Sequence, residues 1–163
     1  MRRVLVVDDE ENLRLVLRTL LTRHGYEVRV AESAEEGLAL LDRVDDLARR
    51  IGAVNTVVVE PDGTLTGFNN DGNGFIQSLR DADPAWRPDS GPILVLGAGG
   101  ASRAVVASLA AQGATEIRVC NRTVDKAQEI ADAVGSVVKV VAWDQREGAL
   151  DGIAMLANAT SLG

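Results

Sequence analysis

Hydrophobic residues in the first quarter of the chain alternate between continuous runs and stretches with a helical period. Val4–Val7 is a continuous aliphatic run, which is typical of a strand buried on both faces of a parallel sheet. The next apolar residues recur at spacings of three and four and share one helix face: Leu13, Val16, Leu17 and Leu20. A second strand over 27–31 and a helix with a capping-box start over 33–43 follow. Residues 1–43 therefore predict a β-α-β-α segment.

The pattern changes after about residue 44. Residues 51–59 form a long apolar run that predicts a strand, and the turn residues 60–63 follow it. Residues 64–68 then return as a second strand, so this part of the chain predicts an antiparallel hairpin. A short helix ending near Arg80 comes next.

The second half of the chain repeats the alternation of strands and helices. The predicted strands are 93–96, 116–120, 137–142 and 154–157, and the predicted helices are 102–111 and 124–134. Residues 81–92 contain three of the four prolines, which marks a boundary between domains 1–86 and 87–163. The expected class is α/β, with three layers, flavodoxin-like and Rossmann-like parallel sheets and one antiparallel hairpin.

Composition narrows the classes of partner. Hydrophobic residues make up 46% of the chain and charged residues 25%, which is typical of a globular protein. The net charge of −7, without a cluster of Lys and Arg, argues against nucleic acid and membrane partners. Cys120 is the only cysteine, which excludes an internal disulfide, and the apolar run at the N-terminus is too short to span a membrane. We expect a cytoplasmic protein.

A glycine-rich loop follows the predicted strand 93–96 and opens the next helix. Its residues are Gly97, Ala98, Gly99, Gly100, Ala101 and Ser102. This context fits a dinucleotide-binding loop, in which glycines allow a tight turn and close approach of the pyrophosphate to the helix N-terminus. The alternative is a glycine-rich turn that binds no ligand.

The end of the following strand carries cations where a site that prefers NAD would usually carry a carboxylate. The residues there are Asn121, Arg122, Thr123 and Lys126. Arg122 and Lys126 could pair with the 2′-phosphate of NADP, which favours NADP over NAD. Alternatively, both cations are solvated residues at the start of a helix.

Residues 47–163 resemble shikimate dehydrogenases. The resemblance rests on Ile51–Thr56, on Asn69–Phe75, on the loop 97–104, on the run 121–127 and on the final residues 158–163. It implies NADP-dependent interconversion of shikimate and 3-dehydroshikimate. Within these motifs, the resemblance assigns Asn55 to substrate binding, Asp71 to a catalytic Lys/Asp pair and Thr160 to the cofactor.

The sequence departs from this family in its lysines. Lys126 and Lys139 are the only lysines, and both lie in the predicted nucleotide-binding part. The family's catalytic lysine precedes the motif at 51–56 and has no counterpart here, and Asn70 replaces a threonine common in the family. We therefore expect NADP(H) binding without a complete catalytic site.

Residues 1–43 resemble the first half of a response-regulator receiver domain. The resemblance rests on Val4–Glu10, Gly25–Val28 and 31–40. It implies that Asp8 and Asp9 hold Mg²⁺, although the family's phospho-accepting strand is missing. The alternative is structural, because carboxylates after a strand and before a helix are favoured by the helix dipole.

Three hypotheses follow. The first is a chimera joined near residue 43 that binds NADP(H) without turnover, and the second is a weakly active shikimate dehydrogenase. The third is a phosphate-responsive signalling module. Unpaired sheet edges also predict a homodimer.

Overall fold

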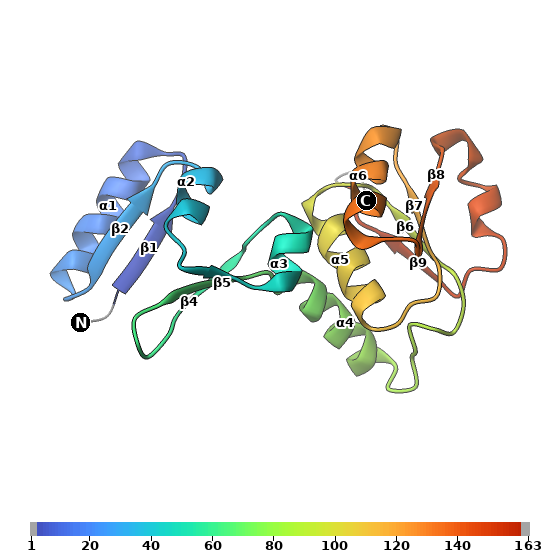
Figure 1. Ribbon diagram of the computed structural model, residues 1–163, viewed down its shortest axis with the longest axis horizontal. Helices are drawn as coiled ribbons and strands as arrows, with labels where there is room; N and C mark the ends of the chain where they lie inside the picture. The colour runs from blue at the N-terminus through green and yellow to red at the C-terminus, as the bar shows by residue number, and fades with distance from the viewer. Residues whose placement is uncertain (1–2, 161–163) are drawn as a thin grey trace. The chain divides into compact units, whose positions relative to one another are not determined.

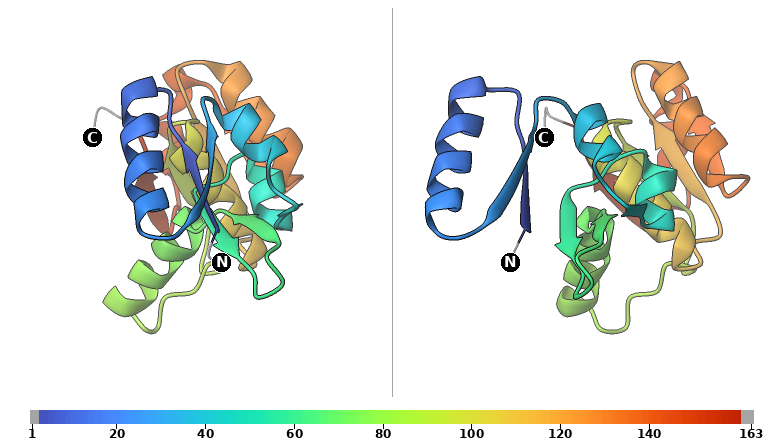
Figure 2. Two further views of the ribbon diagram at one scale, coloured as in Figure 1. Left: turned by 90° about the vertical axis from the view of Figure 1, so that its left-hand side faces the viewer. Right: turned by 60° about the vertical axis from the view of Figure 1, so that its left-hand side comes forward.

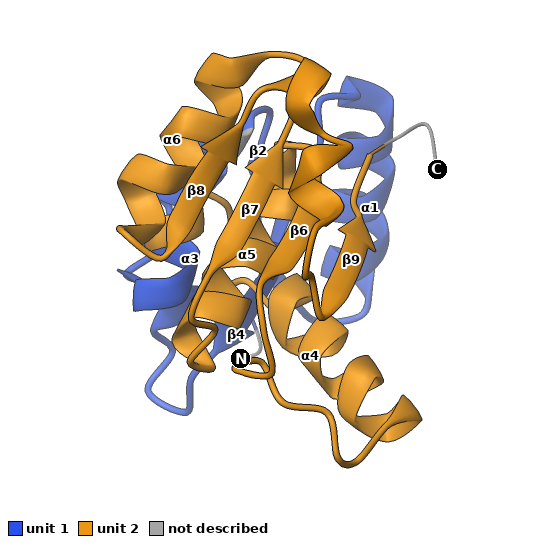
Figure 3. Cartoon of the chain, turned by 90° about the vertical axis from the view of Figure 1, so that its right-hand side faces the viewer, with its two compact units in different colours: residues 1–49, 54–68 blue, residues 50–53, 69–163 orange. Residues whose placement is uncertain are grey.

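The computed structural model describes residues 3–160, which divide into two compact units (Figure 3). Unit 1 consists of Met1–Arg49 and Val54–Phe68, and unit 2 of Arg50–Ala53 and Asn69–Gly163. This division falls upstream of the boundary near residue 86 that the prolines predict, which stays a prediction. Figure 1 shows the order of the elements from β1 to β9.

The first part of unit 1 has the predicted β-α-β-α order. Strand β1 (Arg3–Val7) pairs in parallel with β2 (Glu27–Ala31), and α1 (Glu11–Arg23) connects them. Both views in Figure 2 show α1 beside these two strands. The predicted capping box is present at α2 (Ala34–Ala39), because the Ser33 side chain accepts a hydrogen bond from the Glu36 amide.

The apolar face of α1 remains accessible. None of its residues is buried, and Leu15, Val16 and Leu20 are each more than half exposed. The spacing therefore predicted the helix correctly, while the helix contributes nothing to the buried core of the described residues.

A three-stranded sheet in the order β3-β5-β4 completes unit 1. Its strands are β3 (Arg43–Val44), β4 (Thr56–Val59) and β5 (Leu65–Phe68). Between β3 and β4 the chain forms α3 (Asp46–Ile51), whose last two residues belong to unit 2. The predicted antiparallel hairpin is confirmed, because β4 and β5 pair antiparallel. The turn is closed by the Asp62 carboxylate, which accepts a hydrogen bond from the Thr64 backbone amide at 2.9 Å. Hydrogen bonding from the backbone and the side chain of Thr64 lowers the pKa of Asp62.

The strand predicted over 51–59 is wrong in its first half. Ile51 ends α3, and Gly52 leaves the helix with a φ of +73°. The strand begins only at Thr56. Ile51 is 2% exposed, so burial explains its apolar character without a strand.

Unit 2 is built on four parallel strands in the order β8-β7-β6-β9 (Figure 3). The strands are β6 (Ile93–Leu96), β7 (Ile117–Cys120), β8 (Val138–Val141) and β9 (Met155–Asn158). The helices are α4 (Asp71–Ala82), α5 (Gly100–Ala111) and α6 (Val124–Val134), with the short helical turns η1 (Trp143–Gln145) and η2 (Gly148–Leu150). The expected α/β class with Rossmann-like parallel sheets is confirmed.

The main core of unit 2 lies between this sheet and its helices. Val95, Val106, Leu109 and Ile117 are fully buried there. Helix α5 is rich in Ala, Val and Ser, and small side chains let it pack closely on its neighbours. A smaller cluster of Leu94, Cys120 and Ala149 packs with Trp143.

Helices α4 and α5 make a close contact at Gly72. A Cβ atom on Gly72 would lie 2.0 Å from Ser108 Oγ and 2.4 Å from the carbonyl oxygen of Ala104. Only glycine fits there without a shift of one helix. This contact fixes α4, and with it Asp71, against the helix that begins at the glycine-rich loop.

Candidate functional site

The glycine-rich loop turns sharply at its first residue. Gly97 has a φ of +104°, and its amide donates to the carbonyl of Cys120 at 2.9 Å. A Cβ atom on Gly97 would lie 2.9 Å from the carbonyl oxygen of Ala159. The turn and the close neighbour both require glycine, as the sequence predicts.

The N-terminus of α5 is open to a ligand. Gly99 is the N-cap, no side chain caps the helix, and its first turn contains no acidic residue. A Cβ atom on Gly99 or Gly100 would meet nothing within 4 Å. The unpaired amides and the positive end of the helix dipole therefore face free space, which suits an anionic group such as a pyrophosphate.

Ser102 has a different place from the rest of the predicted loop. It is completely buried, and its Oγ has no hydrogen-bond partner among the described residues. It lies under the turn, 3.1 Å from the Cβ position of Gly97. It supports the loop from below and does not line the open space above it.

Of the four polar residues predicted to bind the cofactor after β7, two line the space above the loop and two do not. Arg122 is exposed and lines the space above the loop, beside Asn121. The Asn121 side chain donates to the Thr123 carbonyl at 2.8 Å, which shapes the start of α6. Thr123 and Lys126 are exposed but lie outside this lining.

The chain after β9 forms the opposite wall. The Ala159 amide donates to the Leu96 carbonyl at 2.9 Å, so this segment is tied to the end of β6. The Asn158 Oδ1 atom accepts bonds from the amide of Thr160 at 3.1 Å and from its hydroxyl at 2.8 Å. Thr160 lines the same pocket, and its assignment to the cofactor stays a prediction.

These segments enclose a pocket of about 730 Å³, within the range of small-ligand sites. Its lining consists of Leu96, Gly97, Ala98, Gly99, Gly100, Ala101, Asn121, Arg122, Trp143, Asn158, Ala159 and Thr160. The sequence had not assigned Leu96, Trp143, Asn158 and Ala159 to the site. Each of them lies at or just after the end of a strand, which is the signal that could have found them.

Asn55 and Asp71 lie outside this pocket and in different units. The Asn55 amide donates to the Phe68 carbonyl at 3.0 Å, within the hairpin of unit 1. Asp71 begins α4 in unit 2, and its amide donates to Asn69 Oδ1 at 3.2 Å. Buried Asn69 donates in turn to the Ala53 carbonyl at 3.2 Å, which ties the start of α4 to the segment 50–53.

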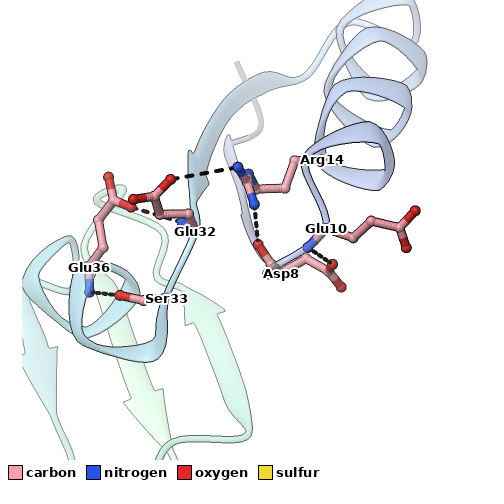
Figure 4. A network of polar contacts seen from close by, with 6 residues as sticks. All are labelled: Asp8, Glu10, Arg14, Glu32, Ser33 and Glu36. Carbon is pink, nitrogen blue, oxygen red and sulfur yellow. Dashed lines mark hydrogen bonds and ion pairs between the residues drawn. The ribbon is translucent and has the colours of Figure 1, made fainter.

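Asp8 and Asp9 follow β1, as the pattern predicts. Figure 4 shows that Asp8 Oδ1 accepts the Glu10 amide, at 2.9 Å, and that Arg14 donates to the Asp8 carbonyl at 2.7 Å. Arg14 also lies 3.8 Å from the Glu32 carboxylate. Within residues 3–160 no group of three or more His, Cys, Asp or Glu side chains could hold a metal ion.

Parallel strands in the order β8-β7-β6-β9, with a glycine loop and a helix N-terminus at the carboxyl end of β6, define a Rossmann-like α/β domain. Known proteins bear this out. A family model described as shikimate/quinate 5-dehydrogenase matches residues 87–162. Among the helices of the described residues, none is long and apolar enough to cross a membrane.

Individual relatives are more specific. A shikimate dehydrogenase (NADP(+)) from Paramagnetospirillum magneticum is 49% identical over 94% of this chain and 56% of its own length. The shikimate dehydrogenase of Aquifex aeolicus is 32% identical, with a TM-score of 0.69, over 100% of this chain and 70% of that one. The Thermus thermophilus enzyme in complex with NADP(H) and shikimate is 32% identical, with a TM-score of 0.65. The match covers 98% of this chain and 69% of that one.

The chain belongs to the shikimate dehydrogenase family, and it spans 56% of the length of the Paramagnetospirillum relative. The interpretation of residues 1–43 as a receiver segment, and of the whole as a chimera, is wrong. The dehydrogenase matches extend over nearly the whole chain, including most of that segment. The β-α-β start is common to many parallel α/β folds, so an acidic run after its first strand does not identify a receiver. The Mg²⁺ interpretation of Asp8 and Asp9 loses its basis with the receiver.

Proposed function

We propose that this chain binds NADP(H) in the pocket at the carboxyl ends of β6, β7 and β9, as the cofactor-binding part of a shikimate dehydrogenase. The observation that carries the proposal is the open N-terminus of α5 beside Arg122. The free space over Gly99 and Gly100 fits a pyrophosphate, and no carboxylate competes in the first turn.

Arg122 would select NADP(H) over NAD(H). Arg122 lines the pocket one strand away from the glycine loop, where the adenosine ribose of a dinucleotide is expected. A planar guanidinium can pair with the 2′-phosphate of NADP(H) through two hydrogen bonds. Lys126, exposed on the next helix turn, adds positive charge nearby.

A calorimetric titration with NADPH and NADH tests this function. We expect micromolar binding of NADPH, weaker binding of NADH, and a loss of the preference in Arg122→Ala. Arg87→Ala is a matched control, because Arg87 lies outside the pocket lining. Absence of NADPH binding by the unaltered chain would refute the proposal.

The family relationship supports a second candidate, slow interconversion of shikimate and 3-dehydroshikimate. Bound NADP(H) would exchange a hydride with the substrate. Asp71 would orient a proton-transferring group, and Asn55 would bind substrate hydroxyls, as the resemblance implies. Both lysines of the chain, Lys126 and Lys139, lie in unit 2 on α6 and β8, so neither precedes the motif at 51–56 as the family's catalytic lysine does.

Turnover is tested separately from binding, by following shikimate-dependent formation of NADPH from its absorbance. We expect at most a slow rate, abolished by Asp71→Asn, while NADPH affinity stays unchanged. A rate that survives Asp71→Asn would contradict the role of Asp71.

A further inference from the structure

Trp143 begins the turn η1 soon after β8, and it is one of the residues that line the pocket. The sheet order β8-β7-β6-β9 places three ligand-facing groups in sequence: the glycine loop after β6, Arg122 after β7 and Trp143 after β8. A dinucleotide that sets its pyrophosphate on the first and its ribose on the second must direct its base toward the third.

We propose that the indole of Trp143 is the surface on which the adenine ring of NADP(H) stacks. The proposal rests on the proposed function and extends it to the part of the cofactor beyond the ribose. Every nucleobase presents a flat π face, and tryptophan offers the largest aromatic surface for it.

The ring of Trp143 is held in place by its own surroundings. The guanidinium carbon of Arg146 lies 5.1 Å from the ring centroid, and Arg146 donates to the Trp143 carbonyl at 2.8 Å. The indole also packs against the cluster of Leu94, Cys120 and Ala149. Arg146 is absent from the pocket lining, so it holds the ring without forming part of the pocket wall. A ring ordered in advance loses little freedom on binding.

Arg118 anchors the connection that carries Trp143. One of its nitrogens donates to the carbonyls of Ala149 at 2.9 Å and Asp151 at 2.8 Å, while Nε pairs with Glu116 at 2.7 Å. The connection between β8 and β9 is therefore bound to β7. These bonds hold the η2 end of the connection, in which Trp143 begins η1.

The experiment uses adenosine 2′,5′-bisphosphate, which contains the adenine and the 2′-phosphate but no nicotinamide. Its affinity and that of NADPH are measured by calorimetry for Trp143→Ala and Trp143→Phe. We expect a loss of roughly tenfold in both affinities for the alanine variant, the effect of one lost stacking contact. The phenylalanine variant keeps an aromatic face and should lose about threefold or less.

Trp86 provides the matched control, because it is the only other tryptophan and packs against the main core away from the pocket. Trp86→Phe should bind as the unaltered chain does. In this variant Trp143 is the single tryptophan, so adenosine 2′,5′-bisphosphate should quench its fluorescence. In Trp143→Phe the emission of Trp86 should not respond.

Each outcome decides the proposal. Unchanged affinity in Trp143→Ala, with a loss in Arg122→Ala, overturns the stacking role and leaves NADP(H) binding intact. Absence of binding by the unaltered chain overturns both. If circular dichroism shows that Trp143→Ala is unfolded, the fluorescence of Trp86→Phe decides, and an unresponsive Trp143 overturns the proposal.

Discussion

The carbonyl oxygen of Ala159 lies 2.9 Å from the position that a Cβ atom would take on Gly97. Gly97 also has a φ of +104°, so Gly97→Ala adds a contact and backbone strain together. We expect this substitution to lower the free energy of unfolding by about 1–3 kcal/mol and to abolish NADPH binding. Urea unfolding and calorimetry measure the two effects.

Gly100→Ala is the control for this prediction. Gly100 begins α5 and has open space at its Cβ position. The fold should therefore tolerate the methyl group within about 1 kcal/mol, while NADPH binding weakens because the methyl group narrows the phosphate site. Equal stability of both variants would contradict the account of Gly97.

Two substitutions at the contact between α4 and α5 should have different effects on the stability of the protein. Gly72→Ala places a methyl group against Ser108 Oγ and the Ala104 carbonyl and should destabilise the protein by about 1–3 kcal/mol. Ser108→Ala removes a buried hydroxyl that has no partner among the described residues and should be neutral or slightly stabilising.

The double variant separates the two clashes at this contact. The backbone carbonyl of Ala104 remains in the way after Ser108→Ala, so the second substitution should relieve only part of the cost. Full recovery of the melting temperature in the double variant would show that the hydroxyl alone limits the approach of the helices.

We expect Arg118 to stabilise the fold mainly through its hydrogen bonds to backbone carbonyls and not through its ion pair with Glu116. Arg118→Leu leaves the carbonyls of Ala149 and Asp151 without their donor, and we expect about 1–3 kcal/mol less stability. Glu116→Gln removes only the partly exposed ion pair and should change stability by about 0–1 kcal/mol. Chemical denaturation of both variants checks the ranking, and a larger loss for Glu116→Gln would contradict it.

Cys120 predicts the dependence of stability on alkaline pH. Burial raises the pKa of its thiol, the Arg146 guanidinium lowers it, and the Asp144 carboxylate raises it. Because the pKa of the thiol is higher in the folded than in the unfolded state, the protonated thiol contributes to the stability of the fold. This contribution is complete below the unfolded-state pKa and is lost as the pH rises through the folded-state pKa. The stability of the parent chain relative to Cys120→Ala should fall above about pH 8.5. A pH-independent difference in urea unfolding would contradict this.

The edge of β9 predicts self-association. Within the described residues β9 pairs only with β6, and its Leu156 is 49% exposed. Unpaired strand edges are templates for association, so we expect a dimer in light scattering at high protein concentration. Leu156→Lys should weaken the dimer, whereas Leu150→Lys, equally exposed on η2, should not. A monomer at all concentrations would refute the expectation.

The glycine loop and Arg122 could be picked out from the sequence because their chemistry is local, whereas Lys126, picked out with them, lies outside the pocket lining. A glycine that must adopt a positive φ, as Gly97 does, and a basic residue directly after a strand are visible without knowing the sheet order. Trp143 and Asn158 were not assigned to the site, because they reach it only through the order β8-β7-β6-β9. Residues 51–59 were misassigned because a buried helix end and a strand look alike over a few apolar residues.

The receiver interpretation failed for a related reason. A strand, an acidic run and an amphipathic helix satisfy the same dipole and packing rules in many α/β proteins. The Asp8 carboxylate accepts the Glu10 amide, a structural use that needs no metal. The match to the Paramagnetospirillum relative covers 94% of the chain, and it assigns most of residues 1–43 to the dehydrogenase family, which the short acidic motif could not do.

Helix α3 begins at Asp46 among residues of unit 1 and ends at Ile51 among residues of unit 2. The chain therefore passes from one unit to the other three times, and no single peptide bond divides it into two complete halves. Melting of unit 1 would unwind the helix that holds buried Ile51 in unit 2. A single protease cut therefore leaves at most one of the two units on one continuous fragment.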